Sequence, residues 1–455
     1  MKKSAQLLIS LAIATATGLS QAADLNEVYQ QALENEHQLK ADQAAYKAAL
    51  QSRKLGLAGL LPQISATAEY ADTDIETRQI NNFDTLPQTV EIPVRGTTYT
   101  VSLTQPIFDL GAWFDYRQGI NVSKQGAAQY AADQQSFIVR VANAYFDVLR
   151  AADVLDNAIA QEKALKHQLE QTQQRFEVGL TAITDVHNAQ ATYDSARAET
   201  LGNQATLGAA YDALEVITGS IHEEVSALSD SFPVTEPTPA NRDQWVDFAL
   251  ENNNQLKTAK LASEAARQAA RAASADHLPT VSARLSEQDD RNYEGQFDGA
   301  NSGFAVSVNL PIFSGGGVSA SRRQASAQHI QAQETYLQTK REIIQSARTR
   351  HLGVITDVAT VAARKQAIIS SESSLEATQA GYEVGTRDFV DVLNAQQGVY
   401  QARADYYNAL YNYIINTLEL KQTAGTLAPE DVVELNQWLD ANNTKTRSSY
   451  ENTSR

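Results

Sequence analysis

Two hydrophobic patterns divide this chain, and the first is a one-by-one alternation of apolar and polar side chains. In the segment FAVSVNL, Phe304 and Val306 share one face and Ser307 lies on the other. Alternation with a period of two is typical of β-strands. A half-buried sheet and a transmembrane β-barrel with its apolar side outward both give this pattern. It predicts two hairpin-like pairs of strands, at about 62–74 and 97–108 and at about 279–289 and 302–313.

The second pattern is a spacing of three and four residues, which indicates α-helices. It extends from Gly111 to about Gly219 and from about Ser319 to Gly425, with strong interruptions at the elements VGL and VGT. Forty helical residues reach about 60 Å, so we expect these helices to pack against neighbours in this chain or in copies of it. The last helix carries a heptad seam, formed by Val390, Leu393, Gln397, Tyr400, Ala404, Tyr407, Tyr411, Ile414 and Leu418.

The whole pattern is written twice. ALENEHQLK (32–40) returns as ALENNNQLK (249–257), and FEVGLTAITDVHNAQ (176–190) returns as YEVGTRDFVDVLNAQ (382–396). A repeat of about 200 residues is a complete supersecondary assembly rather than a short solenoid unit. We therefore expect two similar halves at 23–220 and 242–427, joined by a linker at 221–241 and followed by a last segment with a polar tail at 428–455.

Residues 1–22 have the form of a secretory signal peptide. Lys2 and Lys3 precede an apolar stretch from Leu7 to Leu19, and Ala22 ends a small-residue cleavage pattern. The apolar stretch is too short to span a bilayer as a helix. We therefore expect an exported protein whose mature form begins near residue 23.

Composition excludes several classes of function. The chain has no cysteine, which excludes disulfides and a lipid anchor through cysteine. Its formal net charge of −17 argues against a nucleic-acid partner, because phosphate binding needs a basic surface. The sequence contains no GxxxxGK[ST], HExxH or GxSxG motif. We therefore expect no enzymatic activity, no cofactor and no metal site.

The strand number constrains the architecture. Four strands cannot close a barrel, since outer-membrane barrels need at least eight. If these strands cross a membrane, several copies of the chain must share one barrel, and three copies give twelve strands. The competing hypothesis is a soluble periplasmic coiled-coil scaffold in which the hairpins form small sheets. Membrane fractionation separates these two hypotheses.

The chain contains a characteristic set of segments. It comprises the junction LLPQISATAEY, the strand end LTQPIFD, the segments ANAYFDVL, DHLPTVS and LPIFSGG, and the repeated VGL and VGT elements. On these segments, which span the mature sequence, the chain resembles the TolC family of outer-membrane efflux and secretion channels. The resemblance implies a mixed α/β membrane protein. Three chains would form a twelve-stranded β-barrel continuous with a twelve-helix periplasmic α-barrel.

The resemblance also implies a function and partners. Such a channel is the passive exit duct of efflux pumps and type I secretion systems, and conducts drugs, proteins or both across the outer membrane. Its expected partners are a periplasmic adaptor protein, an inner-membrane transporter of the RND, ABC or MFS type, and outer-membrane lipid. An iris-like opening of the periplasmic helix ends would gate it.

The family's gate residues align with positions of this chain. Its two constricting aspartate rings correspond to Asp391 and Asn394, so the second ring here is not acidic. Its latch residues correspond to Thr184, Asp185, Tyr382 and Arg387. The turns at which the family docks its adaptor contain Gly179 and Gly385, although glycine also suits these positions simply because it permits tight turns.

We predict that Asp391→Ala lowers the cation selectivity of single channels in planar bilayers. A ring of carboxylates attracts cations and repels anions, and with Asn394 in the second ring Asp391 supplies the charge at this level. Unchanged selectivity would remove Asp391 from the pore.

Overall fold

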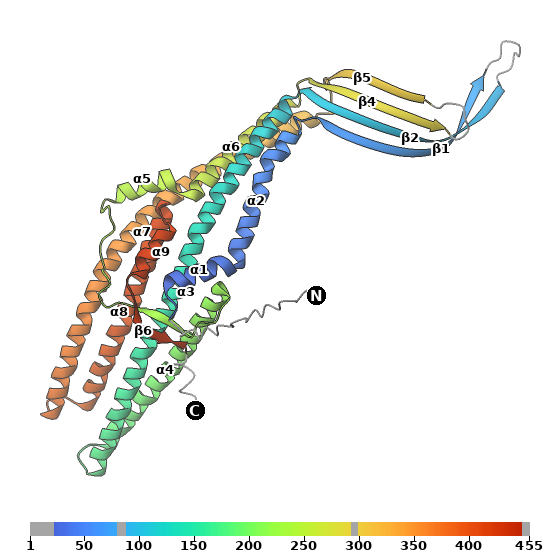
Figure 1. Ribbon diagram of the computed structural model, residues 1–455. Coiled ribbons are helices and arrows are strands. Elements are labelled where there is room, and N and C mark those ends of the chain that lie inside the picture. Colours follow the sequence, from blue (N-terminus) through green and yellow to red (C-terminus); the bar gives the residue numbers. More distant parts are fainter. Residues whose placement is uncertain (1–21, 80–87, 293–298, 448–455) are drawn as a thin grey trace, which may run out of the picture. The chain divides into compact units, whose positions relative to one another are not determined.

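Figure 1 shows a computed structural model of the protein, which describes residues 22–79, 88–292 and 299–447. All but the last residue of the expected signal peptide, and residues 448–455 of the tail, lie outside the described residues. The chain forms two compact units. The sheet unit contains residues 40–133 and 249–345, and the helical unit contains the described residues of 1–39, 134–248 and 346–455.

The sheet unit is built around a four-stranded antiparallel sheet. Its strands are β1 (Gln63–Gln79), β2 (Gln88–Phe108), β4 (Thr280–Asn292) and β5 (Gly299–Asn309), in the spatial order β1-β2-β4-β5. Helices α2 (His37–Ala58) and α6 (Asn254–Ala275) lead into the two hairpins, and α3 (Leu110–Glu177) and α7 (Gly317–Glu383) follow them. Strands β1 and β5 are therefore the two edges of the sheet.

One face of this sheet is apolar and uncovered within the chain. The pairing register places Ile64 opposite Leu103, Leu103 opposite Leu285, and Leu285 opposite Phe304. This row crosses all four strands, and the side chains at its ends, Ile64 and Phe304, are 72% and 71% exposed. Val306 continues the apolar face and is also exposed. The alternating pattern makes this face apolar, and no other part of the described chain covers it.

The opposite face is polar and cross-linked by side chains. The hydroxyls of Ser65 and Ser102 lie 3.0 Å apart, and Arg284 donates to the Ser102 hydroxyl at 3.4 Å. Ser282 and Ser307 repeat the hydroxyl pair at 2.9 Å on the other hairpin. Each face thus has one chemical character across four strands.

The four predicted strands all form, with shifted ends. Pro106 does not end β2, because pairing continues to Phe108 across an irregularity in register. β5 ends at Asn309, so the expectation of a strand up to residue 313 is wrong. Leu310–Phe313 instead connect β5 to α7, next to a turn in which Gly315 and Gly316 have positive φ.

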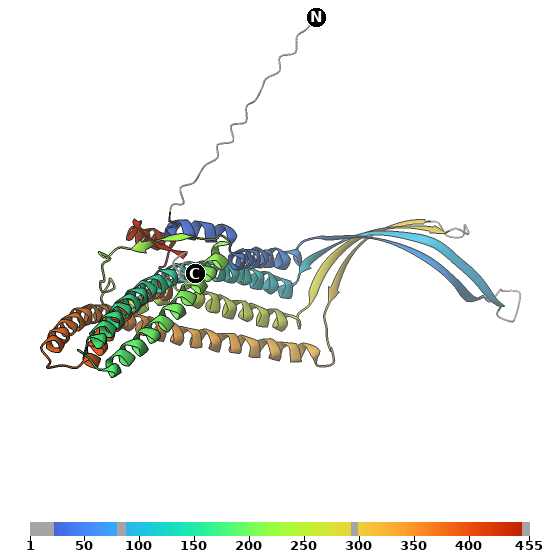
Figure 2. The ribbon, with the colours of Figure 1, turned by 90° about the horizontal axis from the view of Figure 1, so that it is seen from below.

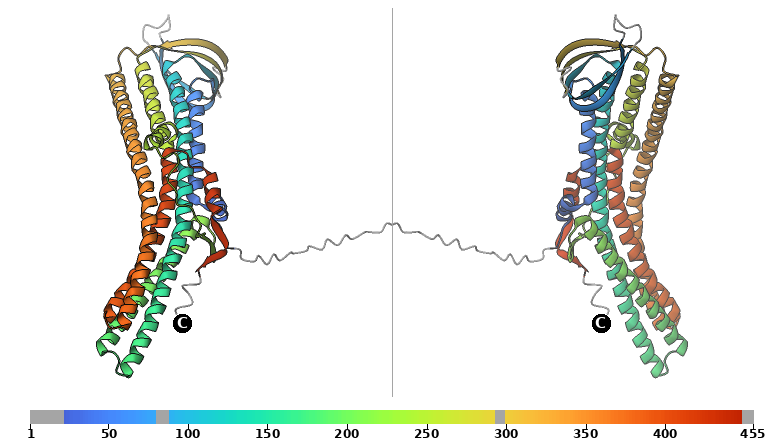
Figure 3. Two further views of the ribbon diagram at one scale, coloured as in Figure 1. Left: turned by 90° about the vertical axis from the view of Figure 1, so that its left-hand side faces the viewer. Right: turned by 90° about the vertical axis from the view of Figure 1, so that its right-hand side faces the viewer.

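The helical unit contains two pairs of adjacent helices. The later part of α3 lies beside α4 (Ile183–Thr218), and the later part of α7 lies beside α8 (Phe389–Ala424), as Figures 1 and 3 show. Both predicted helix interruptions are confirmed by these boundaries. Shorter helices complete the structure: α1 (Leu25–Asn35), α5 (Arg242–Asn252, which spans the boundary between the units) and α9 (Pro429–Asn436).

The heptad seam in α8 is only partly correct. Tyr411, Ile414 and Leu418 are buried as expected, whereas Val390 is 40% exposed. In the first half of the helix the buried face is displaced by about one residue. It comprises Phe389, Val392, Leu393, Gln396, Val399 and Ala402. Phe389 and Leu393 of this face pack in one hydrophobic cluster with residues of both α3 and α4.

A second sheet pairs β3 (Glu224–Leu228) with β6 (Leu439–Thr446) in antiparallel fashion. Both strands were missed, because sequence analysis gave these segments as a linker and as part of the terminal segment. β3 is too short for a clear alternation, and β6 reads LDANNTKT, which has almost no apolar face. Long-range pairing, rather than local pattern, makes β6 a strand.

Three buried tyrosines join the helices to this small sheet and to one another. Tyr145 donates its hydroxyl to Ser226 O at 2.7 Å, Tyr211 to Lys445 O at 2.7 Å, and Tyr411 to Asp153 Oδ2 at 2.5 Å. Burial raises the pKa of Tyr145 and of Tyr411 well above the usual value. These hydroxyls therefore remain protonated donors, as their partners require.

Lys445 completes this network from β6. Its ammonium lies 2.8 Å from Asp153 Oδ1 and 2.7 Å from Asp156 Oδ2. Burial by itself lowers the pKa of Lys445, but the two carboxylates outweigh burial and raise the pKa. The side chains of Lys445 and Asp153 are only 16% and 14% exposed, so this ion pair is largely shielded from water.

We predict that Lys445→Met lowers the free energy of unfolding by about 3 kcal/mol, because removing one partner leaves a mostly buried carboxylate without its cation. Thermal unfolding of the detergent-solubilised protein, followed by circular dichroism, measures the loss. Arg403→Met is the matched control: Arg403 pairs with Glu372 at 2.6 Å, but both side chains are more than 40% exposed. Arg403→Met should lower the free energy of unfolding by less than about 1 kcal/mol. Equal losses in the two variants would show that shielding from water does not set the strength of the ion pair.

Candidate functional site

The candidate site lies at the two turns that connect the paired helices of the helical unit. At the first, Leu180 N donates to Arg175 O at 2.8 Å, and Gly179 has φ +77°. At the second, Thr386 N donates to Gly381 O at 2.8 Å. Gly385 there has φ +75°. Both turns use the six-to-one hydrogen bond and left-handed glycine that commonly end a helix.

Glycine is required at these turns by backbone conformation rather than by space. A Cβ added at Gly179 or Gly385 would meet nothing within 4 Å, but positive φ disfavours any other residue. The neighbouring side chains Val178, Leu180 and Val384 are 69%, 69% and 75% exposed. The turns thus present apolar side chains on a hydrogen-bonded backbone, which suits a docking site as well as a simple turn.

A small hydrophobic cluster joins the two helix pairs near these turns. It contains Leu165 and Leu169 of α3, Ala189 and Ala196 of α4, and Phe389 and Leu393 of α8. Tyr382, at the end of α7, is partly buried against it. Tyr382 is therefore held by packing on its ring, independently of any bond to its hydroxyl.

The Tyr382 ring has two specific neighbours. The Phe389 ring lies 5.8 Å away at an interplanar angle of 52°, and the Arg175 guanidinium lies 5.3 Å from the Tyr382 centroid. Arg175 was missed by sequence analysis. Its equivalent in the second repeat, 206 residues later, is Gly381, and this difference between the copies was the available signal. The contact is a cation–π interaction between the end of α3 and the end of α7.

Arg387 and Asp391, predicted as latch and ring residues, contact each other. Arg387 Nη1 lies 3.6 Å from Asp391 Oδ2, and the two positions are four residues apart. Asp388 caps the same helix, because its carboxylate accepts from Asp391 N at 2.9 Å. Asn394 lies one turn further along α8 and is exposed. Arg387 therefore partly neutralises the carboxylate that sequence analysis assigned to the pore.

The equivalent positions in the first repeat make a neutral version of this contact. Thr181 Oγ1 donates to Asp185 Oδ2 at 2.5 Å, again across four residues. Thr184 is exposed. Within the described part of this chain, no hydrogen bond or ion pair joins Tyr382 or Arg387 to Thr184 or Asp185. The latch contacts therefore stay a prediction.

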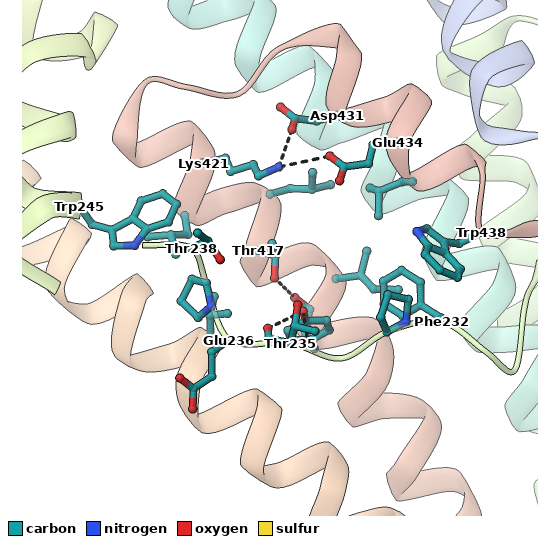
Figure 4. A pocket seen from close by; sticks show the side chains of 18 residues that line it. Phe232, Thr235, Glu236, Thr238, Trp245, Thr417, Lys421, Asp431, Glu434 and Trp438 are labelled. Atoms are coloured by element: carbon teal, nitrogen blue, oxygen red, sulfur yellow. Dashed lines mark hydrogen bonds and ion pairs between the residues drawn. The ribbon is translucent and has the colours of Figure 1, made fainter. Parts of the chain in front are cut away.

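A cavity of about 290 Å³ lies elsewhere in the helical unit, beneath the linker (Figure 4). Its aromatic lining comprises Phe232, Trp245, Tyr413 and Trp438. Its main polar groups are already paired: Lys421 lies 2.6 Å from Asp431, Trp245 donates to Pro239 O at 2.7 Å, and Tyr413 donates to Thr235 O at 2.8 Å. These bonds fasten the linker to α5 and α8, and α8 to α9.

Among the residues that the structure describes, none of the groupings of His, Asp and Glu could hold a metal ion. Within 22–79, 88–292 and 299–447, every helix is too short or too polar to cross a membrane.

Comparison with known proteins decides the family. The sequence profile described as "Outer membrane efflux protein" matches residues 28–220 and 245–426. The chain belongs to the outer membrane efflux protein family. It is therefore an outer-membrane channel of the class that serves efflux and type I secretion, with a periplasmic tunnel, and a soluble scaffold is not favoured.

Individual relatives cover nearly the whole chain. The outer membrane protein TolC of Escherichia coli is 36% identical over 96% of this chain and 90% of its own length, and TolC of Vibrio cholerae is 34% identical over 96% and 99%. The proteases secretion protein PrtF of Dickeya chrysanthemi is 28% identical over 96% and 95%. These relatives are channel and secretion proteins, which agrees with a non-enzymatic role.

Solved structures share the fold. CusC superposes with a TM-score of 0.76 at 17% identity, covering 89% of this chain and 92% of its own. The outer membrane protein VceC of Vibrio cholerae gives 0.74 at 19% identity, covering 88% and 96%.

We predict that Tyr382→Phe combined with Arg387→Ser raises single-channel conductance in planar bilayers. The pair of substitutions removes one hydroxyl and one cation but keeps the packed ring, so it tests the latch and not the cluster. Each lost bond is worth about 1–3 kcal/mol, which shifts a closed–open equilibrium by about tenfold or more.

Arg364→Ser is the control for the latch, because Arg364 makes an ion pair of 2.7 Å with Asp405, away from the turns. This control should leave conductance unchanged. If the double variant also stays at the conductance of the unmodified channel, the latch assignment is wrong.

Proposed function

We propose that three copies of this chain form a passive duct through the outer membrane, with a twelve-stranded barrel continuous with a twelve-helix periplasmic tunnel. The observation that carries the proposal is the four-stranded sheet. One of its faces is apolar and exposed, the other is hydrogen-bonded and polar, and β1 and β5 are both open edges. Joining β5 of one copy to β1 of the next closes the sheet.

Backbone hydrogen bonding supports a closed ring over an open sheet. In lipid, every unpaired N–H or C=O costs several kcal/mol, and only closed barrels and helices satisfy them all. Four strands per copy reach twelve with three copies, which lies in the range of known outer-membrane barrels. The apolar face then contacts lipid, and the serine-rich face lines the duct.

The domain organisation follows from the same proposal. Residues 1–22 are the signal peptide, 23–220 and 242–427 are the two repeats, and 221–241 and 428–455 form a segment around the middle of the tunnel. The order α2–β1–β2–α3 and α6–β4–β5–α7 supports two repeats, since each contributes one hairpin between two helices. The copies then supply six similar units around one axis.

The helix turns are proposed as the gate and docking end. Three copies of Asp391 form one carboxylate ring, whose charge Arg387 reduces in the closed state, and Asn394 forms a neutral ring beside it. Thr184 and Asp185 receive Tyr382 and Arg387 when helices of neighbouring copies approach. Opening requires the Arg387 side chain to move away from Asp391 or from Thr184 and Asp185. Opening of the gate therefore changes the net charge of the Asp391 ring.

The proposed partners follow from the absence of a nucleotide motif in the sequence. An inner-membrane transporter of the RND, ABC or MFS type supplies energy, and a periplasmic adaptor docks at the turns that contain Gly179 and Gly385. The exported material is drugs, proteins or both. Membership in the outer membrane efflux protein family supports efflux, and similarity to the proteases secretion protein PrtF supports protein secretion.

Disulfide cross-linking tests the closed ring, and the absence of cysteine makes the natural chain a clean background. Ser65→Cys on β1 should be combined in turn with Ser307→Cys and with Gly303→Cys on β5. Oxidised outer membranes should then yield covalent trimers in at least one combination, because the edges of neighbouring copies pair. Ser65→Cys alone should yield none.

Recovery of the unmodified protein in the soluble fraction, or only monomers in both double variants, would contradict the proposed barrel.

A further inference from the structure

A cluster of arginines lies in the sheet unit between α6 and α7, close to the sheet. The two helices lie side by side and end near β4 and β5 in Figures 2 and 3. A cleft of about 430 Å³ separates their side chains. It is lined by Arg267, Ala270, Arg271 and Ser274 of α6 and by Arg322, Arg323, Ser326 and His329 of α7. We refer to it as the arginine cleft.

The charge of this cleft is opposite to that of the protein. The chain carries a formal net charge of −17, yet residues 265–275 and 317–333 contain four arginines and no aspartate or glutamate. Such a local excess in an acidic protein leaves the cleft able to attract anions. The four guanidinium groups also repel one another, so an anion between them is stabilising.

The arginines of α7 have few partners within the chain. Arg267 makes an ion pair with Glu264, one turn earlier on α6, and Arg271 lies 5.9 Å from the centre of the Phe114 ring. For Arg322 and Arg323, no ion pair occurs with any described residue. At least two guanidinium groups are therefore available, and their planar forks match phosphate oxygens better than an ammonium does.

If the sheet spans the membrane, the end of the cleft nearest the sheet, at Arg271 and Arg322, lies at the outer limit of the lipid headgroups. Ile312 and Phe313, at the end of the exposed apolar band, are 92% and 86% exposed. Arg322 follows the first residue of α7, Gly317, by about 8 Å along the helix axis. The headgroup layer on each side of the hydrocarbon is about 5–8 Å thick. Arginine side chains can also reach back toward that layer.

The direction of the chain identifies the leaflet. Helices α2, α3, α6 and α7 adjoin the sheet at one end, where β1 and β4 begin and β2 and β5 end. The other ends of the four strands, at Gln79, Gln88, Asn292 and Gly299, are therefore the ends away from the helices. Since the helices belong to the periplasmic side in the proposed function, the arginine cleft faces the periplasmic leaflet. We propose that Arg267, Arg271, Arg322 and Arg323 bind the phosphate groups of anionic phospholipids in that leaflet, and thereby fix the depth of the barrel.

This inference rests on the proposed membrane barrel, and its test separates the two. The full-length, detergent-solubilised trimer is mixed with phosphatidylglycerol or phosphatidylcholine, and bound lipid is counted by native mass spectrometry. Phosphatidylglycerol should bind about tenfold more tightly than phosphatidylcholine. Arg322→Gln with Arg323→Gln should remove most of that preference, and Arg267→Gln with Arg271→Gln should reduce it from the other helix.

A matched pair on the same helix controls for net charge. Lys340→Gln with Arg341→Gln removes the same charge about 27 Å further from the sheet, and should leave the preference unchanged. Arg322→Lys with Arg323→Lys keeps the charge but not the forked geometry, and should retain part of the preference.

Three outcomes would overturn the lipid site. The first is an unchanged preference in both glutamine double variants, and the second is an equal loss in the control. The third is complete displacement of phosphatidylglycerol by millimolar inorganic phosphate, which would identify a free-anion site instead. Each variant is also checked for membrane recovery and edge cross-linking. If a glutamine variant is trimeric and membrane-bound but keeps its lipid preference, only the lipid site is contradicted. If the unmodified protein is recovered in the soluble fraction, the proposed function is contradicted.

Discussion

Unsatisfied backbone at the edges of the four-stranded sheet is the constraint on which the rest of the molecule depends. β1 and β5 each present a row of N–H and C=O groups that their own chain cannot pair. In water such edges favour aggregation, and in lipid they are too costly to persist. The proposed solution is to pair edge with edge between copies. That solution also explains why an apolar sheet face remains exposed in the single chain.

The duplication provides similar halves, and small differences between them provide chemistry. Thr181 and Asp185 in one copy correspond to Arg387 and Asp391 in the other, and in both pairs a residue just before the helix contacts a carboxylate in its first turn. In the first contact a neutral hydroxyl donates to a carboxylate, and the second contact is an ion pair. Similarly, Arg175 of the first copy lies over the Tyr382 ring of the second, and its own equivalent in the second copy is Gly381. A ring of six identical units could not contain these contacts between unlike residues.

Much of the candidate site could be found from sequence. The VGL and VGT elements identified both turns, and the structure gives the physical reason in the positive φ of Gly179 and Gly385. The Arg387–Asp391 contact was not predicted, because Arg387 precedes the helix cap at Asp388 and the turn decides where its side chain lies. Arg175 could not be found in this way, since α3 and α7 must be placed beside each other first. The arginine cleft was missed for the same reason, because its two halves lie on helices that are separated in the sequence by a whole hairpin.

The sequence by itself determined the types of most elements, the two faces of each strand and the absence of recognisable catalytic motifs. These properties are local, because they depend on a periodicity of two or about 3.6 residues and on a few glycines and prolines. Tertiary structure decided the rest. It made a strand of the polar segment 439–446, buried Lys445 between two carboxylates, and moved the buried face of α8. Each of these depends on long-range partners, whose free energy exceeds the local preference of the segment.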